Sequence, residues 1–137
     1  MNDFFARIYE LGNVFFMEGF SEDLYDNSLY LPVGLVMLIS SFIGMLIYYY
    51  AIPNPKYDRW YHWFGLIALI AVINAVYAYW TVGSELDIIY AQADSVVPYS
   101  IEFFNFATVD FLWTLIACFA VSMIIKWKSK NFRKTPF

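Results

Sequence analysis

Three long apolar stretches decide what this chain can fold into. They cover residues 31–51, 60–82 and 100–125, and they contain very few charged side chains. An α-helix rises about 1.5 Å per residue, so the shortest stretch reaches roughly 31 Å, enough to cross a hydrocarbon core of about 30 Å. Strands do not fit, because the apolar runs are continuous rather than alternating and three strands cannot close a barrel. The sequence therefore predicts three transmembrane helices.

The composition excludes an ordinary soluble protein. Hydrophobic residues make up 61% of the 137 residues and charged residues only 15%, whereas soluble domains carry about 25% charged residues. A chain this short has too little interior to bury 14 Phe, 12 Tyr and 5 Trp. The single Cys and single His exclude a disulfide framework and a Cys/His metal cluster within one chain. We expect an all-α integral membrane protein, in which an N-terminal amphipathic interfacial helix precedes the three spans.

The positions of the cations indicate the orientation of the chain. Seven of the eight lie in the loop between the first two spans or after the third span: Lys56, Arg59, Lys126, Lys128, Lys130, Arg133 and Lys134. By the positive-inside rule we expect them in the cytoplasm, where they anchor the topology and attract anionic lipid headgroups. Residues 1–30 then lie outside, residues 31–125 form the transmembrane domain and residues 126–137 form a basic cytoplasmic tail. We expect this topology in the bacterial inner membrane.

The segment before the first span is amphipathic and acidic. Plotted at about 100° per residue, its apolar side chains share one half of a helix: Phe4, Phe5, Ile8, Leu11, Phe15, Phe16 and Phe20. The other half carries acids together with Arg7, whereas membrane-surface helices usually carry cations there. The apolar half therefore fits another protein subunit as well as the lipid of the outer leaflet, and the sequence leaves both alternatives open.

Polar residues within the spans form a second pattern. Counted from the middle of each predicted span, five of them lie at similar depth: Asp110, Asn74, Ser40, Ser41 and Thr114. A lone ionised aspartate there costs about 2.5 to 3.5 kcal/mol on insertion scales, so Asp110 should face inward, find hydrogen-bond donors or stay protonated. In one interpretation Asp110 bonds to Asn74 and the serines, and the cluster fixes the register of three packed helices. In the other, Asp110 binds a proton or cation along a pathway. The first is favoured, because the spans offer no chain of ionisable groups.

Small and aromatic residues indicate which helix faces pack together. On the second span, Gly65, Ala68, Ala71, Ala75 and Ala78 form a stripe that we expect to face the other helices. Bulky residues such as Ile67 and Ile70 are expected either to face lipid or to form an interface to other spans. Tyr and Trp near the span ends are expected to ring the two membrane surfaces, with Tyr48, Tyr49 and Trp63 on the cytoplasmic side.

The motifs favour a structural role over catalysis. We do not expect an enzyme, because the chain lacks a nucleophile-and-base pair, a metal constellation and a cofactor fingerprint. We expect a non-catalytic membrane subunit that acts as a scaffold or anchor in a multi-protein cell-envelope assembly, such as a secretion or injection machine or an energy-transducing complex. Its expected partners are the lipid bilayer and other membrane subunits, identical or different; no nucleic acid, small-molecule substrate or cofactor is implied.

The alternative is a homo-oligomeric pore or ion channel in which Asp110 lines the pathway. In this alternative several copies of the chain surround an axis, and the carboxyl group is the one ionisable group near the middle of the bilayer. The layout of three spans, an outside N-terminus and a basic tail resembles that of small phage holins, and no motif accompanies this similarity.

Overall fold

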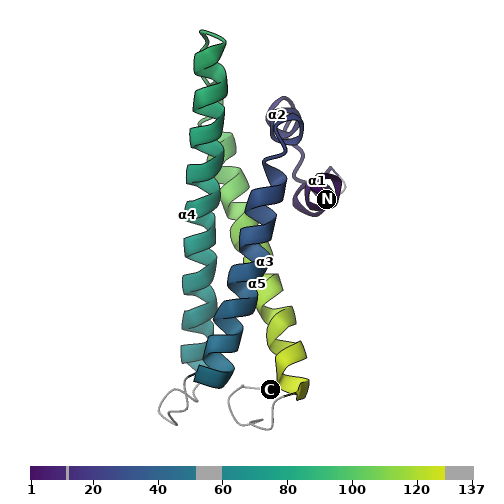
Figure 1. The fold of residues 1–137 in the computed structure, drawn as a ribbon, viewed down its shortest axis with the longest axis vertical. Helices are drawn as coiled ribbons and strands as arrows, with labels where there is room; N and C mark the ends of the chain where they lie inside the picture. Colours follow the sequence, from purple (N-terminus) through teal and green to yellow (C-terminus); the bar gives the residue numbers. More distant parts are fainter. Residues whose placement is uncertain (12, 52–59, 129–137) are drawn as a thin grey trace.

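The chain folds into three long helices, with a short N-terminal segment folded against one end of the bundle (Figure 1). The computed structural model describes residues 1–11, 13–51 and 60–128. Along the chain the elements are α1 (Asn2–Glu10), α2 (Phe20–Asp26), α3 (Tyr30–Leu46), the π-helix η1 (Ile47–Ala51), α4 (Trp60–Gln92) and α5 (Ile101–Lys128). The described part of the chain is thus entirely helical, apart from turns and connections.

Three helices are long and apolar enough to cross a membrane: Tyr30–Tyr50, Trp60–Gln92 and Ile101–Lys126. The prediction of three such helices is confirmed. The second one differs in length, because α4 continues to Gln92, ten residues beyond the predicted end at residue 82. Val82 and Leu86, one turn apart, are fully buried, and Leu86 belongs to the same apolar cluster as Phe20 of α2. Packing against the N-terminal segment therefore accompanies the extension of α4 beyond its most apolar part.

The buried face of α4 differs from the predicted small-residue stripe. Ala71 and Ala78 are buried as expected, but Gly65 and Ala68 are exposed. Ile67 and Ile70 are buried, so of their two predicted roles the structure shows the interface to other helices. The buried residues of α4 are Trp63, Ile67, Ile70, Ala71, Asn74, Ala78, Val82 and Leu86. The small residue that permits this contact is on α3, since a Cβ added to Gly44 would lie 2.4 Å from Cδ1 of Ile70. A close contact between two helices needs a small residue on only one of them. The small-residue stripe on α4 therefore did not show which face of α4 packs against the other helices.

The aromatic residues at the η1 end are also more buried than predicted. Tyr48, Tyr49 and Trp63 pack inside the bundle instead of ringing a membrane surface. The hydroxyl groups of Tyr49 and Ser122 lie 2.6 Å apart, and the Trp63 indole donates to the same Ser122 oxygen at 3.2 Å. One serine of α5 thus joins η1 to the start of α4, which explains why the rings of Tyr49 and Trp63 turn inward.

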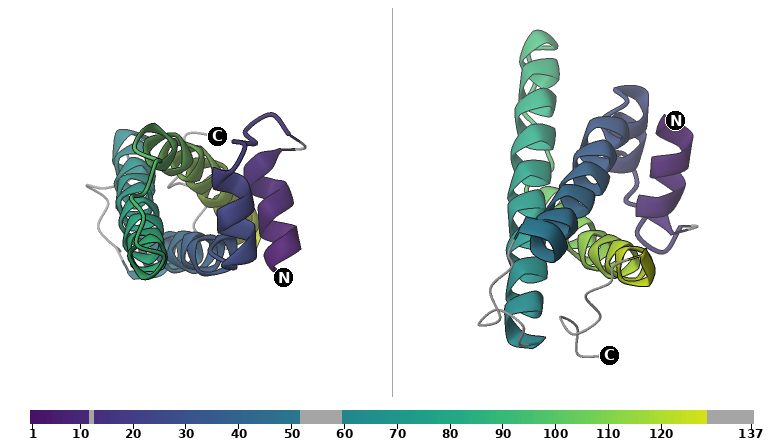
Figure 2. Two further views of the ribbon diagram at one scale, coloured as in Figure 1. Left: turned by 90° about the horizontal axis from the view of Figure 1, so that it is seen from above. Right: turned by 60° about the horizontal axis from the view of Figure 1, so that its bottom comes forward.

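The N-terminal segment contains two short helices rather than the single amphipathic helix that the sequence predicted. The first helix ends at Glu10, and three of the following residues have positive φ: Leu11 (44°), Asn13 (83°) and Gly19 (78°). Residues other than glycine rarely adopt a positive φ, and a residue in this conformation cannot continue a right-handed helix. Figure 1 and the view from above in Figure 2 show α1 lying crosswise to the long helices, beside α3.

Candidate functional site

Asp110 is the central residue of the site and lies in the buried face of α5. Its side chain has no solvent exposure, and Oδ1 accepts a hydrogen bond of 2.5 Å from the hydroxyl of Tyr9 in α1. The Tyr9 ring packs against Phe106 at 5.1 Å between centroids. Burial, together with the Asp110 carboxylate, raises the pKa of Tyr9 well above its ordinary value, so Tyr9 remains a protonated donor. The prediction that Asn74 and the serines bond to Asp110 is therefore wrong, because Tyr9 of the N-terminal segment supplies the donor instead.

The other oxygen of Asp110 is not satisfied in the same way. Oδ2 is buried and accepts no hydrogen bond from any residue that the structure describes. The hydroxyl of Thr114 donates to the backbone carbonyl of Asp110 at 2.8 Å and leaves the carboxyl group untouched. A carboxylate offers about four acceptor positions, and here a single donor reaches it.

The remaining predicted polar residues form a separate contact. Ser40 of α3 and Asn74 of α4 bond to each other, with distances of 3.0 and 2.8 Å between the hydroxyl and the two amide atoms. The Ser41 hydroxyl is buried and has no partner of hydrogen-bonding geometry among the described residues, although the Cys118 thiol lies beside it. Equal depth thus did not bring all of the predicted residues together, because Asn74 faces α3 whereas Asp110 faces α1.

Three further tyrosines pair with carboxylates at this end of the bundle. Tyr30 of α3 donates to Glu10 of α1 at 3.1 Å. Tyr25 of α2 donates to Asp3 of α1 at 2.6 Å, and this hydrogen bond raises the pKa of Tyr25. Tyr90 of α4 donates to Asp23 of α2 at 2.7 Å. We call these pairs, with Tyr9 and Asp110, the tyrosine clasp: Tyr9–Asp110, Tyr25–Asp3, Tyr30–Glu10 and Tyr90–Asp23. The clasp connects the N-terminal segment to all three long helices.

Apolar packing reinforces the clasp. The ring of Phe5 in α1 lies directly over Gly34 in α3, so closely that a Cβ at position 34 would come within 2.1 Å of Cδ1 of the ring. Phe5 and Phe20 are buried in the apolar cluster that also contains Val33 and Phe106. The absence of a side chain at Gly34 therefore creates the space in which α1 docks.

The apolar half of the N-terminal segment is thus used mainly within the chain itself. Phe5 and Phe20 are buried, Ile8 and Phe15 are half-buried, and Phe4, Leu11 and Phe16 remain exposed. The sequence pattern predicted that this apolar half contacts either lipid or another subunit. A contact with the chain's own bundle was not predicted. Tyr9 was missed for a related reason, because it lies at the border between the apolar and polar halves. A hydroxyl at such a border is a signal that the helix makes a buried polar contact.

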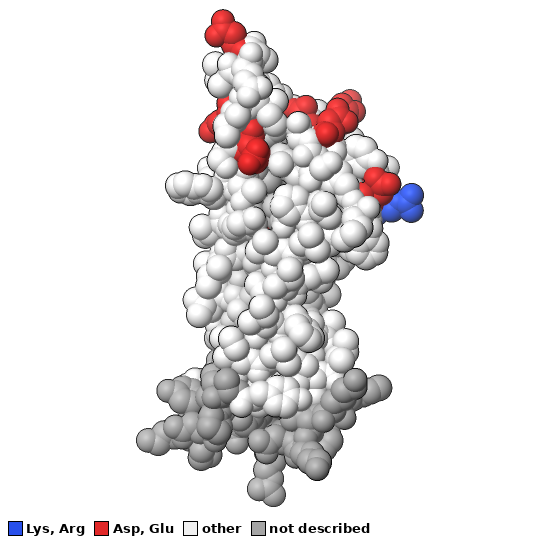
Figure 3. All heavy atoms as spheres, viewed as in Figure 1, with Lys and Arg blue, Asp and Glu red and all other residues white. Residues whose placement is uncertain are grey.

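The charged side chains are unevenly distributed over the described surface. Acidic residues gather at the end that carries the N-terminal segment (Figure 3); those exposed there are Asp3, Glu18, Glu22, Asp26, Glu85, Asp87 and Asp94. Among the predicted cationic anchors, Lys126 is half-buried in the last turns of α5, at the opposite end of that helix from Glu102. Lys56, Arg59, Lys130, Arg133 and Lys134 lie outside the described residues, as does the side chain of Lys128.

Within the described ranges, no group of three His, Cys, Asp or Glu side chains is arranged to hold a metal ion. Comparisons of the chain with protein-family models, with curated proteins and with solved structures found no match. The site must therefore be interpreted from its geometry.

Proposed function

We propose that this chain is a non-catalytic integral membrane subunit that acts as a scaffold or anchor in a multi-protein cell-envelope assembly. The proposed orientation has the acidic end outside and the basic tail in the cytoplasm, in a bacterial inner membrane, following the positive-inside rule. The observation that carries the proposal is the tyrosine clasp, because it fixes two acidic helices in one position on the bundle.

The surface of α1 and α2, which the tyrosine clasp fixes in position, is an acidic docking platform for a basic partner. Residues 1–30 and 83–102 together contain ten acidic residues and one cation, Arg7. On the platform itself, Glu22 and Asp26 of α2 are exposed one turn apart. Complementary charge between two surfaces speeds their encounter and excludes wrong partners, even where it adds little affinity. A subunit with a basic surface outside the membrane fits this end of the molecule.

The polar groups within the long helices support a structural rather than a transporting role. The Ser40–Asn74 contact joins α3 to α4, and the contact around Ser122 joins η1, α4 and α5. Such bonds between membrane helices contribute about 0.6 kcal/mol each on average. They fix the register of the bundle, which is what a rigid support for the N-terminal segment requires.

Gentle extraction tests the proposal. The full chain, carrying an affinity tag, is extracted from its native membrane in mild detergent, and the proteins that accompany it are identified by mass spectrometry. We expect stoichiometric partners with a basic surface. Deletion of residues 2–20 should weaken the association, and Glu22→Lys should weaken it more than the matched change Glu22→Asp, which keeps the charge. Recovery of the chain solely with copies of itself contradicts the scaffold proposal.

One observation favours the second candidate, a homo-oligomeric pore or ion channel with Asp110 on its pathway. The unsatisfied Oδ2 of Asp110 is the kind of group that a transported proton or cation could use. α1 covers this carboxyl group through Tyr9, so α1 has to move aside before Asp110 can line a pathway. Flux through liposomes that is abolished by Asp110→Asn and increased by Tyr9→Phe would favour the pore; absence of flux from the wild type contradicts it.

A further inference from the structure

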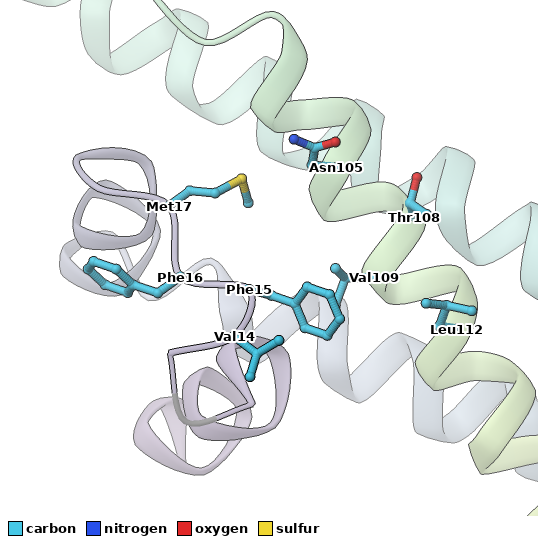
Figure 4. Close-up of a pocket in the computed structure, with 8 residues that line it drawn as sticks. All are labelled: Val14, Phe15, Phe16, Met17, Asn105, Thr108, Val109 and Leu112. Atoms are coloured by element: carbon cyan, nitrogen blue, oxygen red, sulfur yellow. The ribbon is translucent and has the colours of Figure 1, made fainter.

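A groove runs between the N-terminal segment and α5. Its volume is about 280 Å³, and it is lined by Val14, Phe15, Phe16, Met17, Asn105, Thr108, Val109 and Leu112. Figure 4 shows the ring of Phe15 pointing across toward Val109, while Met17 extends toward the part of α5 that carries Asn105. The tyrosine clasp holds the two walls of the groove in place, because Tyr9 and Asp110 connect α1 to the same part of α5.

The lining changes from polar to apolar along α5. Asn105 and Thr108 are exposed near the start of the helix, and Val109 and Leu112 follow farther in. Thr108 already donates to the Phe104 carbonyl at 2.9 Å, whereas the Asn105 amide makes no hydrogen bond with any described residue. An amide without a partner is costly in hydrocarbon, so Asn105 is favoured where the surroundings of the chain offer it a polar group.

The position of the groove along the candidate span matches one leaflet of a bilayer. The span in α5 has 26 residues, which reach roughly 39 Å against a hydrocarbon core of about 30 Å. Asn105 lies about 6 Å from Ile101 along the helix axis and Leu112 about 16 Å. Asn105 thus lies near the boundary between headgroups and hydrocarbon, and Leu112 near the middle of the bilayer.

We infer that this groove binds one glycerolipid of the leaflet at the acidic end, an inference that rests on the proposed membrane insertion. The amide of Asn105 bonds to an ester or headgroup oxygen, and one acyl chain follows the apolar wall formed by Val14, Phe15, Val109 and Leu112. The polar entrance and apolar interior correspond to the order of these groups in a lipid. The lipid then supplies the partner that the chain does not provide for Asn105.

The size of the groove suits part of a lipid molecule. Its volume is about 280 Å³, just below the roughly 300 Å³ at which sites for whole small molecules start. An acyl chain is narrow and adapts to an irregular wall.

Lipid retention tests the inference directly. The full chain is reconstituted into vesicles of phosphatidylethanolamine and phosphatidylglycerol, flotation confirms insertion, and native mass spectrometry counts lipids retained after extraction. We expect one retained glycerolipid on the wild type. Asn105→Leu should lower the retained fraction about fivefold, the factor that one hydrogen bond contributes. Thr108→Trp should lower it further by filling the groove, whereas Ala68→Trp on exposed α4 should leave it unchanged.

The outcomes separate this inference from the proposal on which it rests. A chain that does not float with the vesicles overturns the membrane insertion and the lipid site together. A chain that floats, while wild type and all three variants retain equal lipid, overturns the lipid site alone. A photoreactive benzoylphenylalanine at position 112 should yield adducts of lipid mass, and at Ile73, exposed on α4, far fewer. Adducts of protein mass at position 112 would identify a polypeptide as the occupant and contradict the inference.

Discussion

Removal of one hydroxyl group tests how the N-terminal segment is held. Tyr9→Phe keeps the ring and its packing against Phe106 but deletes the donor to Asp110. A hydrogen bond between membrane helices contributes about 0.6 kcal/mol on average and up to about 1.7. Here the variant leaves both oxygens of a buried carboxyl group without a donor, which adds about 1–3 kcal/mol. We expect α1 docking to weaken by about 2 kcal/mol.

Hydrogen exchange of the α1 amides measures this effect. Local opening releases these amides, so a loss of about 2 kcal/mol should increase their exchange about 30-fold. Tyr25→Phe is the matched control, because its bond to Asp3 is exposed and should matter less. Combining Tyr9→Phe with Asp110→Leu removes both polar partners and should restore much of the protection.

The refuting result is specific. If Tyr9→Phe changes exchange in α1 by less than about twofold, or no more than Tyr25→Phe does, the buried hydroxyl does not hold the segment. The packing of Phe5 over Gly34 would then account for the docking by itself.

Three further predictions concern the same contacts. Gly34→Leu should displace α1 and increase its cleavage by protease, whereas Gly65→Leu should not, because nothing lies within 4 Å of a Cβ at that position. Burial raises the pKa of Tyr9, so its hydrogen bond stabilises docked α1 fully below the ordinary tyrosine pKa of about 10 and less as pH rises above it. The protection of the α1 amides, taken relative to their intrinsic base-catalysed exchange rate, should therefore fall above that pH yet change little with added salt. Ser122→Ala should lower the stability to thermal unfolding by about 1–3 kcal/mol, more than Ser84→Ala, whose hydroxyl bonds only within its own helix.

The three long helices could be predicted because hydropathy over a span depends on composition alone. The contacts between them could not, since they depend on which of two facing helices carries the small residue, as Gly44 and Ile70 illustrate. The end of α1 at Glu10 could not be predicted for another reason. A helical projection places Phe15 and Phe20 beside Phe5 whether or not the intervening residues are helical, and the positive φ of Leu11 leaves no signature in composition.

The environment of Asp110 could likewise be predicted only in part. The expectation that Asp110 faces inward and finds a donor followed from the cost of burying a carboxyl group, and the structure places it so. The identity of the donor did not follow, because Tyr9 is 101 positions away in sequence. Such a pairing depends on how α1 folds back onto the bundle, and local patterns carry no information about that.

Site-specific labelling in intact cells tests the central claim that the third span separates the acidic end from the basic tail. The native Cys118 is fully buried, so a new cysteine can be followed against a low background. An impermeant maleimide should label Asp87→Cys, on the exposed extension of α4, in intact cells, and Thr135→Cys only after the cells are opened. Labelling of both positions in intact cells, or of neither, would contradict the topology and the proposals that depend on it.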